Sequence, residues 1–210
     1  ALPLFAEARA HGVRTVLIED VPDMRGLHRD LDLAAERHPG MALLRRFRAP
    51  AELVARQEQE RLLADRRLVF SRSALDRDPG AEALHLPVPA TTWRAGPAVL
   101  LAGPPLARGG VIEALAACEA LGLRLVARGC ETRDAPVALA SAPELSLKGV
   151  CAVLAPAWAE SWPLLCARAA AAGVPLIGSA QGVGLAAHIR VQAGDLAGLQ
   201  LALAQVLQPA

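Results

Sequence analysis

The alternation of short apolar runs with longer segments of helical periodicity most constrains how this chain can fold. Runs such as VRTVLI at residues 13–18 and VCAVLA at residues 150–155 are separated by segments whose apolar residues recur with helical spacing. This alternation is typical of consecutive βαβ units, in which helices cover parallel strands. The sequence therefore predicts an α/β protein with largely parallel sheets and helices on both faces.

A segment rich in proline and glycine, residues 76–97, is interpreted as a linker between two lobes. Before it, residues 24–48 are basic and irregular with weak helical character, and their charges are read as a solvated face. We predict two Rossmann-like lobes, the first incomplete at residues 1–88 and the second, an open and mostly parallel sheet with helices on both faces, at residues 89–210.

The individual elements follow from the same pattern. In the first lobe, strands are expected at residues 13–18 and 67–70, a short strand at 84–86, and helices at 1–12 and 51–66. In the second lobe, strands are expected at residues 99–102, 123–127, 136–140, 150–155, 174–178 and 189–192, the last near an edge, with helices at 109–121, 161–172 and 196–207.

Composition narrows the possible functions. The chain has 22 basic and 21 acidic residues, a net charge of +1, so it shows no basic footprint for nucleic acid or an anionic membrane. No apolar stretch reaches the roughly eighteen residues of a membrane span, and the N-terminus lacks a signal-peptide pattern, so a cytoplasmic protein without a transmembrane segment is expected. The four cysteines are widely spaced and form no CxxC pair, which favours buried, reduced thiols over disulfides or a zinc site.

Three turns that follow strands of the second lobe carry candidate binding residues. In AGPPLARGGVIEAL, Gly103 releases a strand into a tight turn, Arg108 supplies a cation, and Gly109 helps open a helix whose free amides favour an anion. A flexible turn with a solvated arginine remains an alternative. The GxGxxG fingerprint of dinucleotide sites and the GKS or GKT phosphate loop are both absent.

The other two turns are LVARGCETRDAP and the stretch that follows VCAVLAP. Gly129 could let a ligand approach the backbone, although the charges around it are more simply a surface. Glu160 and Ser161 begin the helix SWPLLCARAAAAG, where Glu160 is either a site residue or a helix cap. Trp158 and Trp162 flank this glutamate as packing or as a stacking surface. Since the carboxyl ends of parallel strands share one edge, the three turns are expected to converge.

These turns, in this order, resemble the nucleotide-sugar-binding lobe of group 1 glycosyltransferases, retaining enzymes of the GT-B fold. The resemblance is best over residues 98–184: Gly103, Arg108 and Gly109 match a glycine turn, basic residue and glycine, and LAPAWAESWPLLCARAAAAGVPLIGS matches a proline turn, Glu and helix. The turn QGVG stands where the family has a glycine-rich segment. In the first lobe, HGVRTVLIED and LLADRRLVFSRS are similar to family motifs, and LHLPVPA looks like the passage between lobes.

The resemblance implies transfer of a sugar from a nucleoside diphosphate sugar, of hexosyltransferase type, in a cleft between the lobes. No metal or other cofactor is implied, and the acceptor is left open among a sugar, a lipid-linked group and a protein, as is peripheral contact with a membrane. The resemblance makes Glu160 a catalytic residue on the sugar or acceptor side of the cleft. The donor-binding residues that it implies are Gly103, Arg108, Gly109, Gly129, Ser161, Trp162, Leu164, Leu165 and Arg168.

The sequence departs from the family pattern at three points. A second Glu is usual eight residues after the first, but Arg168 stands there, and a guanidinium cannot accept hydrogen bonds. Pro104 replaces a second arginine of the first turn, and the early part of the acceptor lobe, with its histidine, is not found; His11, His28, His38 and His85 are expected at the surface. Three readings follow: a truncated or divergent glycosyltransferase homologue, a non-catalytic GT-B-like binding or assembly module, and another doubly wound nucleotide- or sugar-binding protein.

Overall fold

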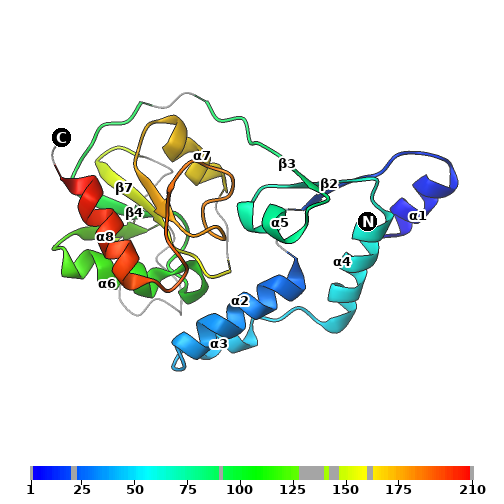
Figure 1. Cartoon of the computed structure of the whole chain (residues 1–210), viewed down its shortest axis with the longest axis horizontal. Coiled ribbons are helices and arrows are strands. Elements are labelled where there is room, and N and C mark those ends of the chain that lie inside the picture. Colours follow the sequence, from blue (N-terminus) through cyan, green and yellow to red (C-terminus); the bar gives the residue numbers. More distant parts are fainter. Residues whose placement is uncertain are drawn as a thin grey trace.

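The structure is a computed structural model that describes residues 2–19, 23–89, 92–127, 140–141, 147–159 and 163–208. Its strands form two parallel sheets flanked by helices, which confirms the predicted α/β class (Figure 1). The predicted positions Gly129, Glu160, Ser161 and Trp162 lie outside the described residues. The division of the chain at residue 88 stays a prediction.

The smaller sheet has three parallel strands in the order β1-β2-β3. Its strands are β1 (Val16–Glu19), β2 (Arg66–Val69) and β3 (Ala81–Ala83), and the helices of this part are α1 (Leu2–Ala10), α4 (Ala51–Leu63) and α5 (Arg72–Arg77). Pro50 precedes α4 and Glu52 lies in its first turn, so this helix begins where the sequence predicts it. The short strand expected at residues 84–86 lies slightly earlier, in β3.

The larger sheet has six parallel strands in the order β6-β5-β4-β7-β8-β9. They are β4 (Ala98–Leu101), β5 (Arg124–Ala127), β6 (Ala140–Ser141), β7 (Val150–Ala155), β8 (Leu176–Gly178) and β9 (Ile189–Arg190). The chain runs outward from β4 to β6, returns to the other side of β4 as β7, and continues outward to β9. The predicted edge strand is confirmed by β9. The winding of the sheet, meaning the direction in which successive strands are added, reverses between β4 and β7.

Helices cover both faces of the larger sheet. They are α6 (Val111–Ala120), α7 (Pro163–Ala171) and α8 (Leu196–Leu207). Successive side chains of a strand point to opposite faces, so Leu101 packs with α6 and α8 while Leu100 packs with the core of α7, and both are fully buried. Burial on both faces explains why strands such as β7 appear in the sequence as uninterrupted apolar runs.

Residues 24–48 form more regular structure than the sequence indicates. They contain α2 (Met24–Arg37) and α3 (Ala42–Arg46), which lie below the gap between the two sheets in the view of Figure 1. Along α2, Leu27, Leu31, Ala34 and Ala35 form a narrow buried stripe at helical spacing. This stripe packs with Trp158 and Ala159 of the second lobe, so the charged face that dominates the sequence conceals an interface.

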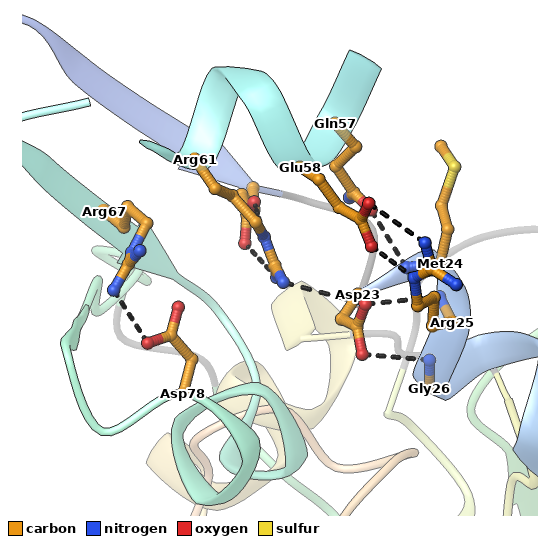
Figure 2. Close-up of polar contacts among 10 residues, drawn as sticks. Asp23, Met24, Arg25, Gly26, Gln57, Glu58, Arg61, Arg67 and Asp78 are labelled. Carbon is orange, nitrogen blue, oxygen red and sulfur yellow. Dashed lines mark hydrogen bonds and ion pairs between the residues drawn. The ribbon is translucent and has the colours of Figure 1, made fainter. Parts of the chain in front are cut away.

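A network of charged and polar groups holds the start of α2 (Figure 2). Asp23 caps the helix by accepting hydrogen bonds from the backbone N–H groups of Arg25 and Gly26, at 3.2 and 2.9 Å. Arg61 of α4 lies 3.7 Å from Asp23 and donates two hydrogen bonds to Glu19 of β1, at 2.6 and 2.7 Å. These bonds to Glu19 raise the pKa of Arg61. The network therefore joins α2, α4 and the carboxyl end of β1.

Two of the described cysteines are buried as predicted, whereas Cys151 is half-buried. Cys118, Cys151 and Cys166 are free, and the first and last are fully buried. Burial raises the pKa of both buried thiols to about 12, so they stay protonated at neutral pH. Cys130 lies outside the described residues.

None of the helices in the described ranges combines the length and apolar character needed to cross a bilayer.

We expect Leu154→Ala to lower the free energy of unfolding by about 3 kcal/mol, because this β7 side chain is fully buried under α6 and α8. Leu201→Ala, on the exposed side of α8, is the matched control, since Leu201 is 62% exposed. Urea unfolding followed by circular dichroism measures both. Equal losses in the two variants would contradict this account of the core.

Candidate functional site

Two of the three predicted turns meet where the winding of the larger sheet reverses. The turn after β4 forms the short helix η1 (Ala107–Gly109), and the turn after β7 contains Trp158 and Ala159. The carbonyl oxygen of Arg108 accepts hydrogen bonds from the backbone N–H groups of Trp158 and Ala159, at 2.9 and 3.2 Å. These bonds connect the two turns directly, beyond the carboxyl ends of β4 and β7, where doubly wound sheets bind their ligands.

The glycine that this junction requires is Gly110. Its φ is +79°, and a Cβ on it would lie 2.4 Å from the carbonyl oxygen of Pro156. Gly109 lies in η1 with no positive φ, and Gly103 is a buried residue after the end of β4. A glycine pair in a sequence does not reveal which member carries the conformational requirement, and here it is the second.

The side chain of Arg108 is half-buried and directed toward α3. Its guanidinium carbon lies 4.3 Å from the centre of the Phe47 ring, a cation–π contact. Phe47 directly follows α3, so this contact joins the switch-point turn to the segment that arrives from the first lobe. A stacked guanidinium uses its face for the ring, while its N–H donors lie in the guanidinium plane.

The candidate residues on α7 have different environments. Leu164 is 46% exposed, whereas the side chain of Leu165 is buried in the core. Leu165 could therefore serve a ligand only through its backbone. Arg168 is half-buried, and its Nε atom is buried without a hydrogen-bond partner among the described residues.

A buried polar group lies beside the junction that sequence reasoning did not identify. Glu113, in the first turn of α6, is 5% exposed, and its Oε1 accepts a 2.8 Å hydrogen bond from Trp158 Nε1. His38 Nε2 lies 2.8 Å from the same oxygen, and the His38 and Trp158 rings meet edge to face, 6.1 Å apart. Glu113 Oε2 is buried and has no hydrogen-bond partner in the described part of the chain.

The surroundings of Glu113 correct the expectation for His38 and decide between the two interpretations of Trp158. The expectation that His38 lies at the surface is wrong, because only 16% of its side chain is exposed. Trp158 is buried and packs against Gly194, where a Cβ would lie 2.4 Å from the indole ring, so it serves in packing. The signal in the sequence was a single Glu in the otherwise apolar first turn of VIEALAACEA.

The carboxyl ends of the two sheets face each other. Arg72, just after β2, donates its backbone N–H to the carbonyl oxygen of Gly184, after β8, at 3.0 Å. A cavity of about 70 Å³ nearby is lined from both sides, by residues that include Phe70 and His85 of the first lobe and Ala167 of α7. The part of this edge near α7 and the segment after β8 thus borders the residues that follow β2 and β3.

A larger cavity, of about 380 Å³, lies between α3 and η1. Arg108 is one of its lining residues, together with apolar side chains of α2 and α3. Within the ranges that the structure describes, no group of three or more His, Cys, Asp or Glu side chains could hold a metal ion.

Comparison with known proteins gives a weak likeness to a solved structure. No family model and no curated protein matches this chain. The crystal structure of AviGT4, a glycosyltransferase involved in avilamycin A biosynthesis, is similar with a TM-score of 0.43 and 18% sequence identity. The match covers 68% of this chain and 59% of the AviGT4 chain, so this chain spans less than two thirds of that structure. A likeness of this size assigns no family.

We expect Gly110→Ala to lower the free energy of unfolding by at least about 2 kcal/mol, because the new Cβ combines left-handed backbone strain with contact at the Pro156 carbonyl. Gly122→Ala is the matched control: its φ is also positive, at +65°, but a Cβ there meets nothing within 4 Å. It should cost only the backbone strain, about 1 kcal/mol. If chemical denaturation gave equal losses of unfolding free energy for the two variants, the contact of the new Cβ with Pro156 would have no cost.

Proposed function

We propose that this chain binds a nucleoside diphosphate sugar at the carboxyl edge of its larger sheet and is a homologue of glycosyltransferases that pass the sugar to an acceptor. One observation carries the proposal. The winding reverses between β4 and β7, and at this point the turn that bears Arg108 is hydrogen-bonded to the turn after β7. Open parallel sheets bind ligands at such switch points.

The chemistry of glycosyl transfer fits the residues of this edge. The bond between the anomeric carbon and the diphosphate oxygen breaks, a bond to an acceptor oxygen forms, and negative charge develops on the departing diphosphate. A fixed cation such as Arg108 and the amides at a helix start stabilise that charge more in the transition state than in the ground state. The sequence resemblance gives Glu160 a role on the sugar or acceptor side. In this proposal no metal ion takes part.

A specific observation favours a second candidate, a nucleotide-sugar-binding or assembly module without transferase activity. The resemblance expects a carboxylate on α7 for the ribose hydroxyls, and Arg168 stands there, half-buried with Nε unpartnered among the described residues. An arginine can donate to a hydroxyl or a phosphate but cannot accept the ribose hydroxyl protons. Without a carboxylate to hold the ribose, the donor would not be positioned for sugar transfer, although the fold would stay intact.

Isothermal titration calorimetry with UDP, GDP and ADP tests the donor site. We expect at least one of them to bind, and Arg108→Ala to weaken that binding about tenfold, because a charge-assisted contact to the diphosphate is lost. Arg124→Ala is the matched control, since Arg124 is an exposed arginine at the opposite, amino end of β5 in the same sheet. If none of the three nucleotides binds, the donor site does not exist; an unchanged affinity in Arg108→Ala would remove that residue from it.

The role of Arg168 is tested by replacing it with a carboxylate. We expect Arg168→Glu to tighten nucleoside diphosphate binding about tenfold, the value of one hydrogen bond between a charged group and a ribose hydroxyl. Arg168→Gln removes the positive charge without adding a carboxylate and should leave the affinity near that of the parent chain. If the two variants bind equally, no ribose hydroxyl lies within reach of this position.

A further inference from the structure

The cavity between α3 and η1 has an apolar interior. Its lining includes Leu31, Leu44 and Ala107, three buried side chains that form its inner part. Toward solvent it is bordered by Leu43 and Phe47, which are 46% and 48% exposed. The volume of about 380 Å³ lies within the range of about 300–1,000 Å³ that is usual for small-molecule sites. An apolar chain could therefore exchange water contacts for contacts with these side chains.

The charged groups of the cavity all have one sign. Arg46, in the last turn of α3, and Arg108 both line it, and no carboxylate is among its described lining residues. Arg46 makes no ion pair or side-chain hydrogen bond with a described residue, unlike nearby Arg48, which is paired with Asp32. A cation at the rim of an apolar cavity, without an internal counter-ion, selects ligands that carry a negative charge at one end.

We propose that this cavity binds an amphiphilic anion, a molecule with an alkyl or acyl chain that ends in a phosphate group. The chain lies against Leu43, Leu44 and Phe47, and the phosphate lies at Arg46, on the side that Arg108 borders. Binding does not depend on the function proposed above. Only a role of the occupant as acceptor rests on that function, because Arg108 belongs to both the cavity and the proposed donor site.

Octyl phosphate, used below its critical micelle concentration, is the probe for calorimetry with the whole chain. We expect it to bind at least about tenfold more tightly than either inorganic phosphate or octanol, because each of these supplies only one of the two kinds of contact. Equal binding of inorganic phosphate would reduce the site to an anion site. Binding to phosphatidylglycerol vesicles without binding to monomeric octyl phosphate would assign the surface to a membrane, and either result overturns the proposal.

Two substitutions locate the site, each with a matched control. Arg46→Gln should weaken octyl phosphate binding about tenfold, whereas Arg45→Gln, one position earlier on the same helix and outside the cavity, should not. Leu43→Asp places a carboxylate at the mouth of the cavity and should weaken binding by about as much again. Leu62→Asp, at a leucine of α4 that is 79% exposed, controls for adding a surface carboxylate.

The same variants separate this proposal from the donor-site proposal. Arg46→Gln and Leu43→Asp should bind nucleoside diphosphates as the parent chain does. If octyl phosphate binds but no nucleotide does, the amphiphile site stands and the glycosyltransferase proposal falls. If neither Arg46→Gln nor Leu43→Asp weakens octyl phosphate binding while both variants keep the circular dichroism spectrum of the parent, the cavity is not the site and this inference is wrong. Sedimentation that shows a dimer broken by Leu43→Asp would assign the cavity to a second copy of the chain.

Discussion

The parallel pairing of β4 with β7 is the interaction on which the second half of this molecule depends. These two strands follow each other in space but not in sequence, and their register sets Leu100 opposite Val153 and Leu101 opposite Leu154. The pairing divides the sheet into two halves that wind in opposite directions. It also fixes the turn of Arg108 beside that of Trp158, since each turn starts at the end of one paired strand. Sheet order, core and candidate site are therefore consequences of one contact.

Much of this arrangement was predictable because both faces of the larger sheet are buried. Burial on both faces makes β4 and β7 continuous apolar runs, and the prolines and glycines between elements mark their ends. What was missed depends on contacts between residues far apart in sequence. His38 and Glu113 are 75 positions apart, and no local pattern shows that they meet. The helical character of α2 was underestimated, because its apolar stripe is narrow and most of its residues are charged or polar. The roles of the candidate site residues stay predictions.

Helix α2 connects the two sheets through polar groups at both ends. At its start, Asp23 contacts Arg61, and Met24 donates its backbone N–H to Gln57 Oε1 at 2.9 Å. Further along, Asp30 pairs with Arg77 of α5 at 2.5 Å, although burial raises the pKa of this aspartate. Past its end, His38 meets Glu113 of the second lobe. The apolar stripe between these ends packs with Ala107, Trp158 and Ala159, in a cluster separate from the two cores of the larger sheet.

The unequal attachment of α2 has a mechanical consequence. Among the described residues, several charged and polar pairs link α2 to the first lobe, whereas its polar link to the second lobe is the contact of His38, just past its end, with one oxygen of Glu113. Helix α2 could leave the second lobe only if its buried stripe also left Trp158 and Ala159 and Phe47 left Arg108, so its polar and apolar attachments would have to break together.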